Sequence, residues 1–290
     1  MKRFVLSVLT VLTCGALQAL PAGNPADASL YTNNFWFGDA SSCDPCDPCG
    51  SWCDWFDWRL GFYGDYVYNR HLKTRANNNN PIAAPVMETS IFTNAGLIAL
   101  DVCDWLEAFG TVGVSNFYIR TTANVWRGLT TSNEETEVFF APSMSYSGGL
   151  RATIWQCDNF YVGGMAQYFY SNTEIDAFLA FVPGTVTHFN TSRSGSYQEW
   201  QVAIGAAYSF MNSANFAFVP YANVEVSGVN WDLQKVFTVD QTYIFQTLRE
   251  NKVVGWSLGL SAILCDLVGV TVEGRWANEK AIHVNGQLSF

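Results

Sequence analysis

Four cysteines stand close together in the stretch CDPCDPCGSWCDW, residues 43–55. Thiols at such short spacings hold iron–sulfur clusters in some proteins, whereas exported proteins use theirs for disulfides. Each of the two Asp-Pro pairs pushes the aspartate toward an extended conformation, which separates neighbouring cysteines. A disulfide needs Cα atoms within about 7 Å, so bridges within this stretch are discouraged but not forbidden.

The start of the chain decides between these chemistries. Lys2 and Arg3 precede an apolar run at residues 4–12, and small residues follow as far as Ala19. This layout predicts a secretory signal peptide, residues 1–19, although Cys14 also raises a lipoprotein alternative that Thr13 before it disfavours. Because a chain exported unfolded is a poor substrate for iron–sulfur assembly, disulfides become the expectation.

The cysteine count points to bonds between chains. The sequence has eight cysteines, and loss of the one in the signal peptide leaves an odd number, so at least one lacks an internal partner. We therefore predict cross-links to neighbouring proteins, with reduced thiols of no role as the alternative. The candidates are Cys43, Cys46, Cys49, Cys53, Cys103, Cys157 and Cys265.

A serine-hydrolase motif is the main enzymatic alternative. The stretch GWSLG, residues 255–259, matches the nucleophile-elbow pattern, and Asp266 and His283 follow in the required order. That motif needs a sharp strand-to-helix turn, whereas Ser257 lies inside an alternating strand with no helical pattern after it. We therefore predict that the chain is not an enzyme, and an outer-membrane hydrolase remains an alternative.

Other cofactor and nucleic-acid chemistry finds little support. The three histidines, His71, His188 and His283, are widely spaced, and no glycine loop for phosphate is present, so we expect neither a metal nor another cofactor. The formal net charge is −10, and the predicted signal peptide removes two of the basic residues. Nucleic acid is not an expected partner, because binding it needs a basic surface.

Composition limits the fold to few classes. Hydrophobic residues make up 49% of the chain and aromatic residues 16%, but charged residues only 14%. Average globular chains carry about 25% charged residues. No stretch reaches the length of apolar residues that a membrane-spanning helix needs. A transmembrane β-barrel or a large soluble β-protein remains.

The apolar pattern predicts strands of membrane length. Residues 200–210, 254–264 and 268–276 alternate between a large apolar face and a small or polar face. Strands of about ten residues suit a tilted crossing of a bilayer. Short turns such as residues 156–159 and 265–267 alternate with longer polar stretches, including residues 171–193, that we interpret as loops. An alternating last strand ending in Phe290 is typical of outer-membrane barrels.

These patterns predict an all-β fold, a transmembrane antiparallel up-and-down β-barrel over residues 58–290. We expect about 16 strands, within a range of 12 to 16, because strands of about ten residues then leave room for connections. A cysteine-rich N-terminal segment, residues 20–57, would precede the barrel. The polar faces of the strands supply the candidate pore-lining residues: Arg59, Asp65, Arg151, Gln167, Glu199, Gln201, Asn223, Glu225, Glu273 and Arg275.

Several unusual peptides resemble the chlamydial major outer membrane protein family, in the family's order from residue 20 to residue 290. Among them are LPAGNPADASL, CDPCDPCGSWCDW, SYQEWQVAIGAAYSF and TVEGRWANEKAIHVNGQLSF. The chain is short for the family, which suggests trimmed surface loops, as in a member from an environmental Chlamydia-like relative. Cys103 and Cys265 stand where other residues are expected, so the disulfide pattern of the family does not transfer directly.

The resemblance implies a porin of the bacterial outer membrane, through which small hydrophilic solutes and ions diffuse passively. It also implies disulfide cross-links to other cysteine-rich envelope proteins, contact with outer-membrane lipid, and a homotrimer. The alternative is a mainly structural or adhesive envelope protein whose pore is incidental.

Overall fold

A computed structural model describes the parts of the chain that form the fold. They are residues 20–31, 33–34, 38–39, 56–74, 85–102, 105–122, 135–182, 185–213, 216–233, 236–237, 242–243, 247–265 and 267–290. The predicted signal peptide, the four clustered cysteines and Cys103 lie outside these described residues. Predictions that concern them remain predictions.

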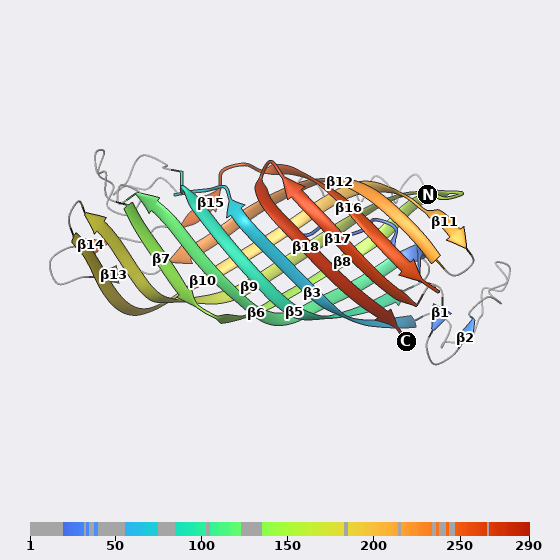
Figure 1. Ribbon diagram of the computed structural model, residues 1–290, viewed down its shortest axis with the longest axis horizontal. Coiled ribbons are helices and arrows are strands. Elements are labelled where there is room, and N and C mark those ends of the chain that lie inside the picture. Colours follow the sequence, from blue (N-terminus) through green and yellow to red (C-terminus); the bar gives the residue numbers. More distant parts are fainter. Residues whose placement is uncertain are drawn as a thin grey trace, which may run out of the picture.

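Strands make up nearly all of the described chain, and one short 3-10 helix, η1, precedes the barrel (Figure 1). No helix in the described ranges is long and apolar enough to cross a membrane. The elements are η1 (Asp27–Ser29), β1 (Asn33–Asn34), β2 (Gly38–Asp39), β3 (Phe56–Arg70), β4 (Leu72–Thr74), β5 (Glu88–Val102), β6 (Leu106–Thr122), β7 (Glu135–Ala141), β8 (Ser143–Cys157), β9 (Phe160–Val182), β10 (Thr185–Tyr208), β11 (Phe210–Ser213), β12 (Phe216–Leu233), β13 (Val236–Phe237), β14 (Thr242–Tyr243), β15 (Leu248–Glu250), β16 (Val254–Leu264), β17 (Val268–Trp276) and β18 (Glu279–Ser289).

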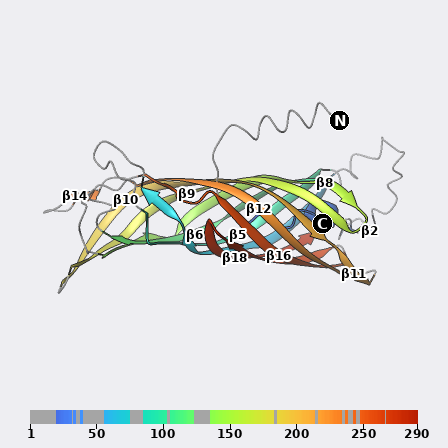
Figure 2. The ribbon, with the colours of Figure 1, turned by 90° about the horizontal axis from the view of Figure 1, so that it is seen from above.

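The long strands close into a ring. Antiparallel pairing runs from β3 through β5, β6, β8, β9, β10, β12, β16 and β17 to β18. The last strand pairs with the first, since Ser289 lies opposite Arg59 and Ile282 opposite Tyr66. β7 continues the line of β8 beyond Pro142 and pairs with the same two neighbours. Within the described residues the ring therefore has 10 strands, tilted along an elongated barrel (Figures 1 and 2).

The distribution of polarity is that of a membrane protein. On β17, Val270 and Val272 are 50% and 47% exposed, whereas Thr271 and Glu273, which alternate with them, are 2% and 1% exposed. A soluble protein buries its large apolar side chains, and here the outer wall exposes them while polar side chains fill the interior. This is the arrangement that lipid outside and polar groups inside require.

The strand count differs from the expected 12 to 16, because the strands are longer than a membrane crossing needs. β9 has 23 residues, β10 has 24 and β12 has 18, whereas a crossing needs about 9–11. Residues 171–182 and 185–193, interpreted above as part of a loop, belong to β9 and β10, which remain paired as far as Val182 and Thr185. The ladder is made by backbone groups, so polar side chains such as those of Ser171 and Thr173 are compatible with it, and polarity alone did not mark a loop.

Candidate functional site

The interior of the barrel gathers all ten predicted pore-lining residues. Each lies on the inward face of its strand, and the most exposed of them, Arg151, is only 7% exposed. Water-sized space beside these side chains is therefore nearly absent. The structure thus brings the predicted set together in one lumen but packs it densely.

One group of charges, here called the first arginine cluster, consists of Arg59 and Arg151 with Asp27, Asp101 and Glu107. Arg59 donates two hydrogen bonds to Asp101, at 2.7 and 2.8 Å, and also bonds Glu107. Arg151 lies 2.6 Å from Asp27 and 3.2 Å from Glu107. β3, β5, β6 and β8 supply the wall residues, so this cluster ties four strands to η1 across the lumen.

A second arginine cluster lies farther along the axis. It consists of Arg70 and Arg275 with Asp65, Glu199, Glu250, Glu273 and Glu279. Arg275 lies 2.7 Å from Asp65, and Arg70 lies 2.9 Å from Glu250 and 3.2 Å from Glu199. Carboxylates outnumber guanidinium groups in both clusters as described. Counted by formal charge, both clusters are therefore net acidic.

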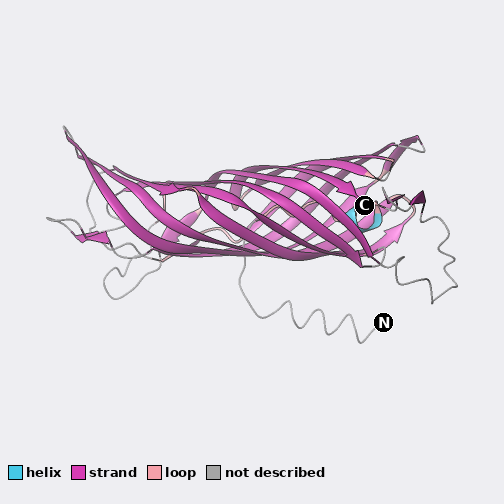
Figure 3. Cartoon of the chain, turned by 90° about the horizontal axis from the view of Figure 1, so that it is seen from below, coloured by secondary structure: helices cyan, strands magenta, loops and turns pink. Residues whose placement is uncertain are grey.

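Residues 20–31, here called the inner segment, run inside the barrel. Residues 20–28, 30 and 31 are buried and Ser29 is half-buried, and Figure 3 places η1 near the end of the barrel that holds the C-terminus. The backbone N–H groups of Ala22 and Gly23 donate to the Glu273 carboxylate at 3.1 and 2.9 Å. Asn223 donates to the carbonyl oxygen of Gly23 at 3.0 Å. Candidate pore-lining residues thus hold the inner segment.

The wall is shaped to admit the inner segment. A Cβ atom at Gly163 would lie 2.2 Å from the carbonyl oxygen of Pro25, and one at Gly269 would lie 1.8 Å from the Tyr31 hydroxyl. Only glycine permits these approaches. Arg59 also stacks over the ring of Tyr31, with 4.4 Å between the guanidinium carbon and the ring centroid.

The contact between η1 and the wall is electrostatic. Burial raises the pKa of the Asp27 carboxyl, and the Arg151 guanidinium beside it opposes that shift. Desolvation is the larger of the two effects. Arg151 is therefore the principal counter-ion of a carboxyl group that has left water.

A buried aromatic cluster fills the lumen toward the end that carries β13 and β14. It is formed by Phe117, Phe140, Phe169, Tyr197 and Trp231, and the ring centroids of Trp231 lie 5.3 Å from Tyr197 and 5.0 Å from Phe140. Trp231 is fully buried, and its indole N–H donates to Thr173 at 3.1 Å. The lumen thus has two obstructions in series, the inner segment and this aromatic cluster.

Sequence reasoning did not include every inward charge, and Arg70 is an example. Strict alternation from Arg59 to Asn69 would turn the next residue, Arg70, outward, yet it is 1% exposed. Asn69 pairs with Lys280 and Val67 with Ala281, so Tyr68 is an extra residue in β3. Such a bulge shifts the phase of the strand and turns the next side chains to the other face. No pattern in the sequence marks that position.

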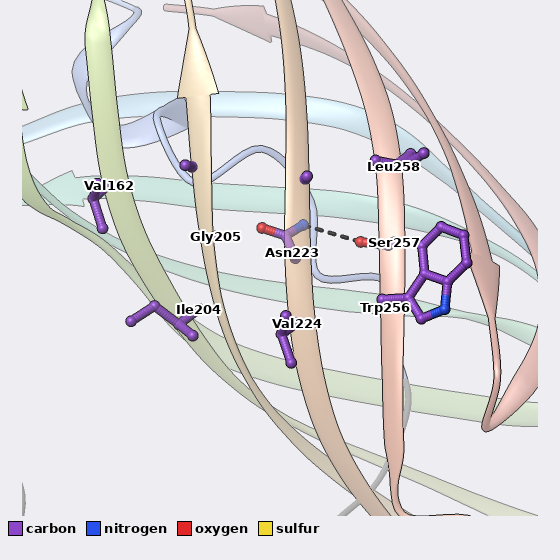
Figure 4. A pocket seen from close by; sticks show the side chains of 10 residues that line it. Val162, Ile204, Gly205, Asn223, Val224, Trp256, Ser257 and Leu258 are labelled. Carbon is purple, nitrogen blue, oxygen red and sulfur yellow. Dashed lines mark hydrogen bonds between the residues drawn. The ribbon is translucent and has the colours of Figure 1, made fainter.

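The hydrolase alternative finds no supporting geometry. Ser257 lies in the middle of β16, is fully buried, and accepts a hydrogen bond from Asn223 at 3.1 Å (Figure 4). His283 is on β18, with β17 between the two strands. Ile204, Val224 and Leu258 line the outer recess on this part of the wall, as the surface toward lipid requires.

Comparisons with known proteins agree with this geometry. A family profile described as Chlamydia major outer membrane protein matches residues 1–90. A major outer membrane porin of Chlamydia pneumoniae is 29% identical, over 100% of this chain and 99% of the relative. The serovar E porin of Chlamydia trachomatis is 26% identical over 100% of both chains. Along its whole length the chain is similar to the chlamydial major outer membrane porins.

An outer-membrane location accounts for the outward polarity, because the apolar wall of the barrel then faces lipid. The alignment with the Chlamydia pneumoniae relative spans 392 positions whereas this chain has 290 residues, so the relative carries long insertions. Among solved structures, the outer membrane protease OmpT of Escherichia coli covers 81% of this chain and 96% of its own, at 12% identity and a TM-score of 0.43. A similarity that weak bears on neither activity nor mechanism.

Proposed function

We infer that this chain is an outer-membrane porin, which lets small hydrophilic solutes cross through its lumen without a chemical step. The observation that carries this function is the polarity of the ring, with apolar side chains toward lipid and arginines and carboxylates toward the axis. The full-length similarity to major outer membrane porins supports it.

The ten inward residues predicted from the sequence are proposed as the walls of the solute path. Rings of carboxylates favour cations. Because carboxylates outnumber arginines in the lumen, we propose a weak preference for cations over anions. The inner segment and the aromatic cluster narrow the path in series, so the open channel requires both of them to move.

Conductance across a planar bilayer tests the function directly. The protein isolated from outer membranes is added to one side, and discrete current steps are expected. The same preparation after heat denaturation serves as the control. Complete absence of steps from a correctly folded barrel would contradict the porin function.

The filled lumen favours a second candidate, a structural envelope barrel whose pore is incidental. Arg59, Arg275 and Trp231 are fully buried, as in a barrel whose interior serves to stabilise it. This candidate predicts a folded barrel with no conductance under any condition. The bilayer measurement therefore distinguishes the two functions.

Cross-linking to other cysteine-rich envelope proteins is proposed for the exposed thiols. Cys157 lies at the tight turn between β8 and β9, is exposed, and forms no disulfide in the structure. Cys265 is exposed at the turn between β16 and β17. Electrophoresis without reductant is expected to show larger species that collapse on reduction and that decrease in Cys157→Ser. The homotrimer, likewise a proposal, is tested by sedimentation of the protein in detergent.

A further inference from the structure

The innermost end of the inner segment lies near a carboxylate, that of Glu225, with one unpaired oxygen. The backbone nitrogen of Leu20 donates to Oε1 of Gln201, and the Gln201 side chain donates through Nε2 to Oε2 of Glu225 at 3.1 Å. Oε1 of Glu225 is buried and has no hydrogen-bond partner among the described residues. One amide side chain thus links the nitrogen of Leu20 to an incompletely paired carboxylate.

This arrangement is costly while Leu20 is an ordinary peptide. Glu225 is fully buried, and no salt bridge to it is found among the described residues. A buried carboxylate is stable only when it is paired and hydrogen-bonded. A peptide N–H offers one donor, and at Leu20 that donor is already used by Gln201.

An α-ammonium group at the same place supplies what is missing. It carries a positive charge and three donors, so it can bond Gln201 and still have donors left for the carboxylate that Gln201 contacts. The predicted signal peptide ends at Ala19, so cleavage creates that group on Leu20. Leu20 is only 4% exposed and belongs to the same buried hydrophobic cluster as Tyr197 and Trp231, so the new terminus lies deep in the lumen.

We propose that Glu225 and Gln201 form an internal binding site for the α-ammonium group of Leu20, and that removal of the signal peptide thereby fixes the inner segment in the lumen. Before cleavage the nitrogen is neutral and the carboxylate remains unpaired. After cleavage the two charges neutralise each other. This inference goes beyond the porin function and holds whether or not solutes pass, but it depends on cleavage after Ala19.

The test compares two N-termini in the presence and absence of the carboxylate. One protein keeps its natural leader, and the second has Gly-Ser inserted between Ala19 and Leu20, so that its mature terminus is displaced. Glu225→Gln is introduced into each, and mass spectrometry verifies every N-terminus. The control substitution is Glu137→Gln, at a half-buried position on β7.

We expect Glu225→Gln to lower the thermal midpoint by about 5 °C or more in the protein that begins at Leu20, since it breaks a buried ion pair. In the extended protein the same substitution removes an unpaired charge, so the midpoint is unchanged or rises. Equal shifts in both backgrounds would overturn the proposal, as would a mature terminus other than Leu20.

A second measurement needs no substitution. In the folded protein the amino group of Leu20 is expected to react with an amine-modifying reagent much more slowly than in the unfolded protein. Lysine side chains on the outer surface provide the internal reference. Equal modification of Leu20 in both states would overturn the proposal even if the Glu225 variants failed to fold.

Discussion

Replacing Asp27 with asparagine tests whether the inner segment obstructs the channel. Asp27→Asn keeps the size of the side chain but removes its charge, and so weakens the 2.6 Å ion pair with Arg151. Hydrogen bonds to charged groups contribute about 1.5–3 kcal/mol each. Since every 1.4 kcal/mol is a factor of about ten, the displaced form of the inner segment should become about 10- to 100-fold more populated.

The assay is single-channel recording in planar bilayers, in which the open probability reports the displaced fraction. The matched control is Asp176→Asn, which makes the same chemical change at an exposed position on β9. We expect Asp27→Asn to raise the open probability and Asp176→Asn to leave it unchanged. If both variants match the unaltered protein while the barrel stays folded, the inner segment is not the obstruction.

Three further predictions concern the lumen and the wall. Because the two obstructions lie in series, deletion of residues 20–31 together with Trp231→Ala should raise the conductance step more than either change alone. A combined increase no larger than the sum of the two single increases would contradict the series arrangement. Glu199→Gln should lower the cation-to-anion permeability ratio measured from reversal potentials, and an unchanged ratio would remove this residue from the solute path. Val272→Arg, in the middle of β17, should destabilise the barrel by about 2–4 kcal/mol in urea titrations, whereas Val268→Arg at the strand end should cost about 0–1 kcal/mol. Equal losses would contradict a position of Val272 nearer the middle of the bilayer than Val268.

The sequence was sufficient to predict the polarity of the wall. Alternation on residues 254–264 assigned Leu258 and Leu260 outward and Ser257 and Ser261 inward, as the structure has them. Period-two alternation is a local signal, and a bilayer outside makes it consistent along each strand. All ten candidate pore residues were predicted to face inward for the same reason, although their role in conduction stays a prediction.

The number of strands could not be obtained in that way. A count needs the length of each strand, and β9 and β10 have 23 and 24 residues, more than twice what a crossing needs. Phase errors have a similar origin, because the extra residue Tyr68 turns Arg70 inward without any change in composition. Length and bulges depend on which strand lies alongside, and that information is not local.

The inner segment was beyond sequence reasoning for a different reason. Residues 20–31 contain no strand or helix pattern of useful length, and their conformation is set by groups far away in the chain. Glu273 holds the backbone of Ala22 and Gly23, and Arg151 holds Asp27. The same contacts explain why a lumen so rich in carboxylates is stable: backbone donors and arginines reach groups that would otherwise be buried and unpaired. We therefore propose two uses for an inward charge in this barrel, to contact a solute when the path is open and to hold the inner segment when it is closed.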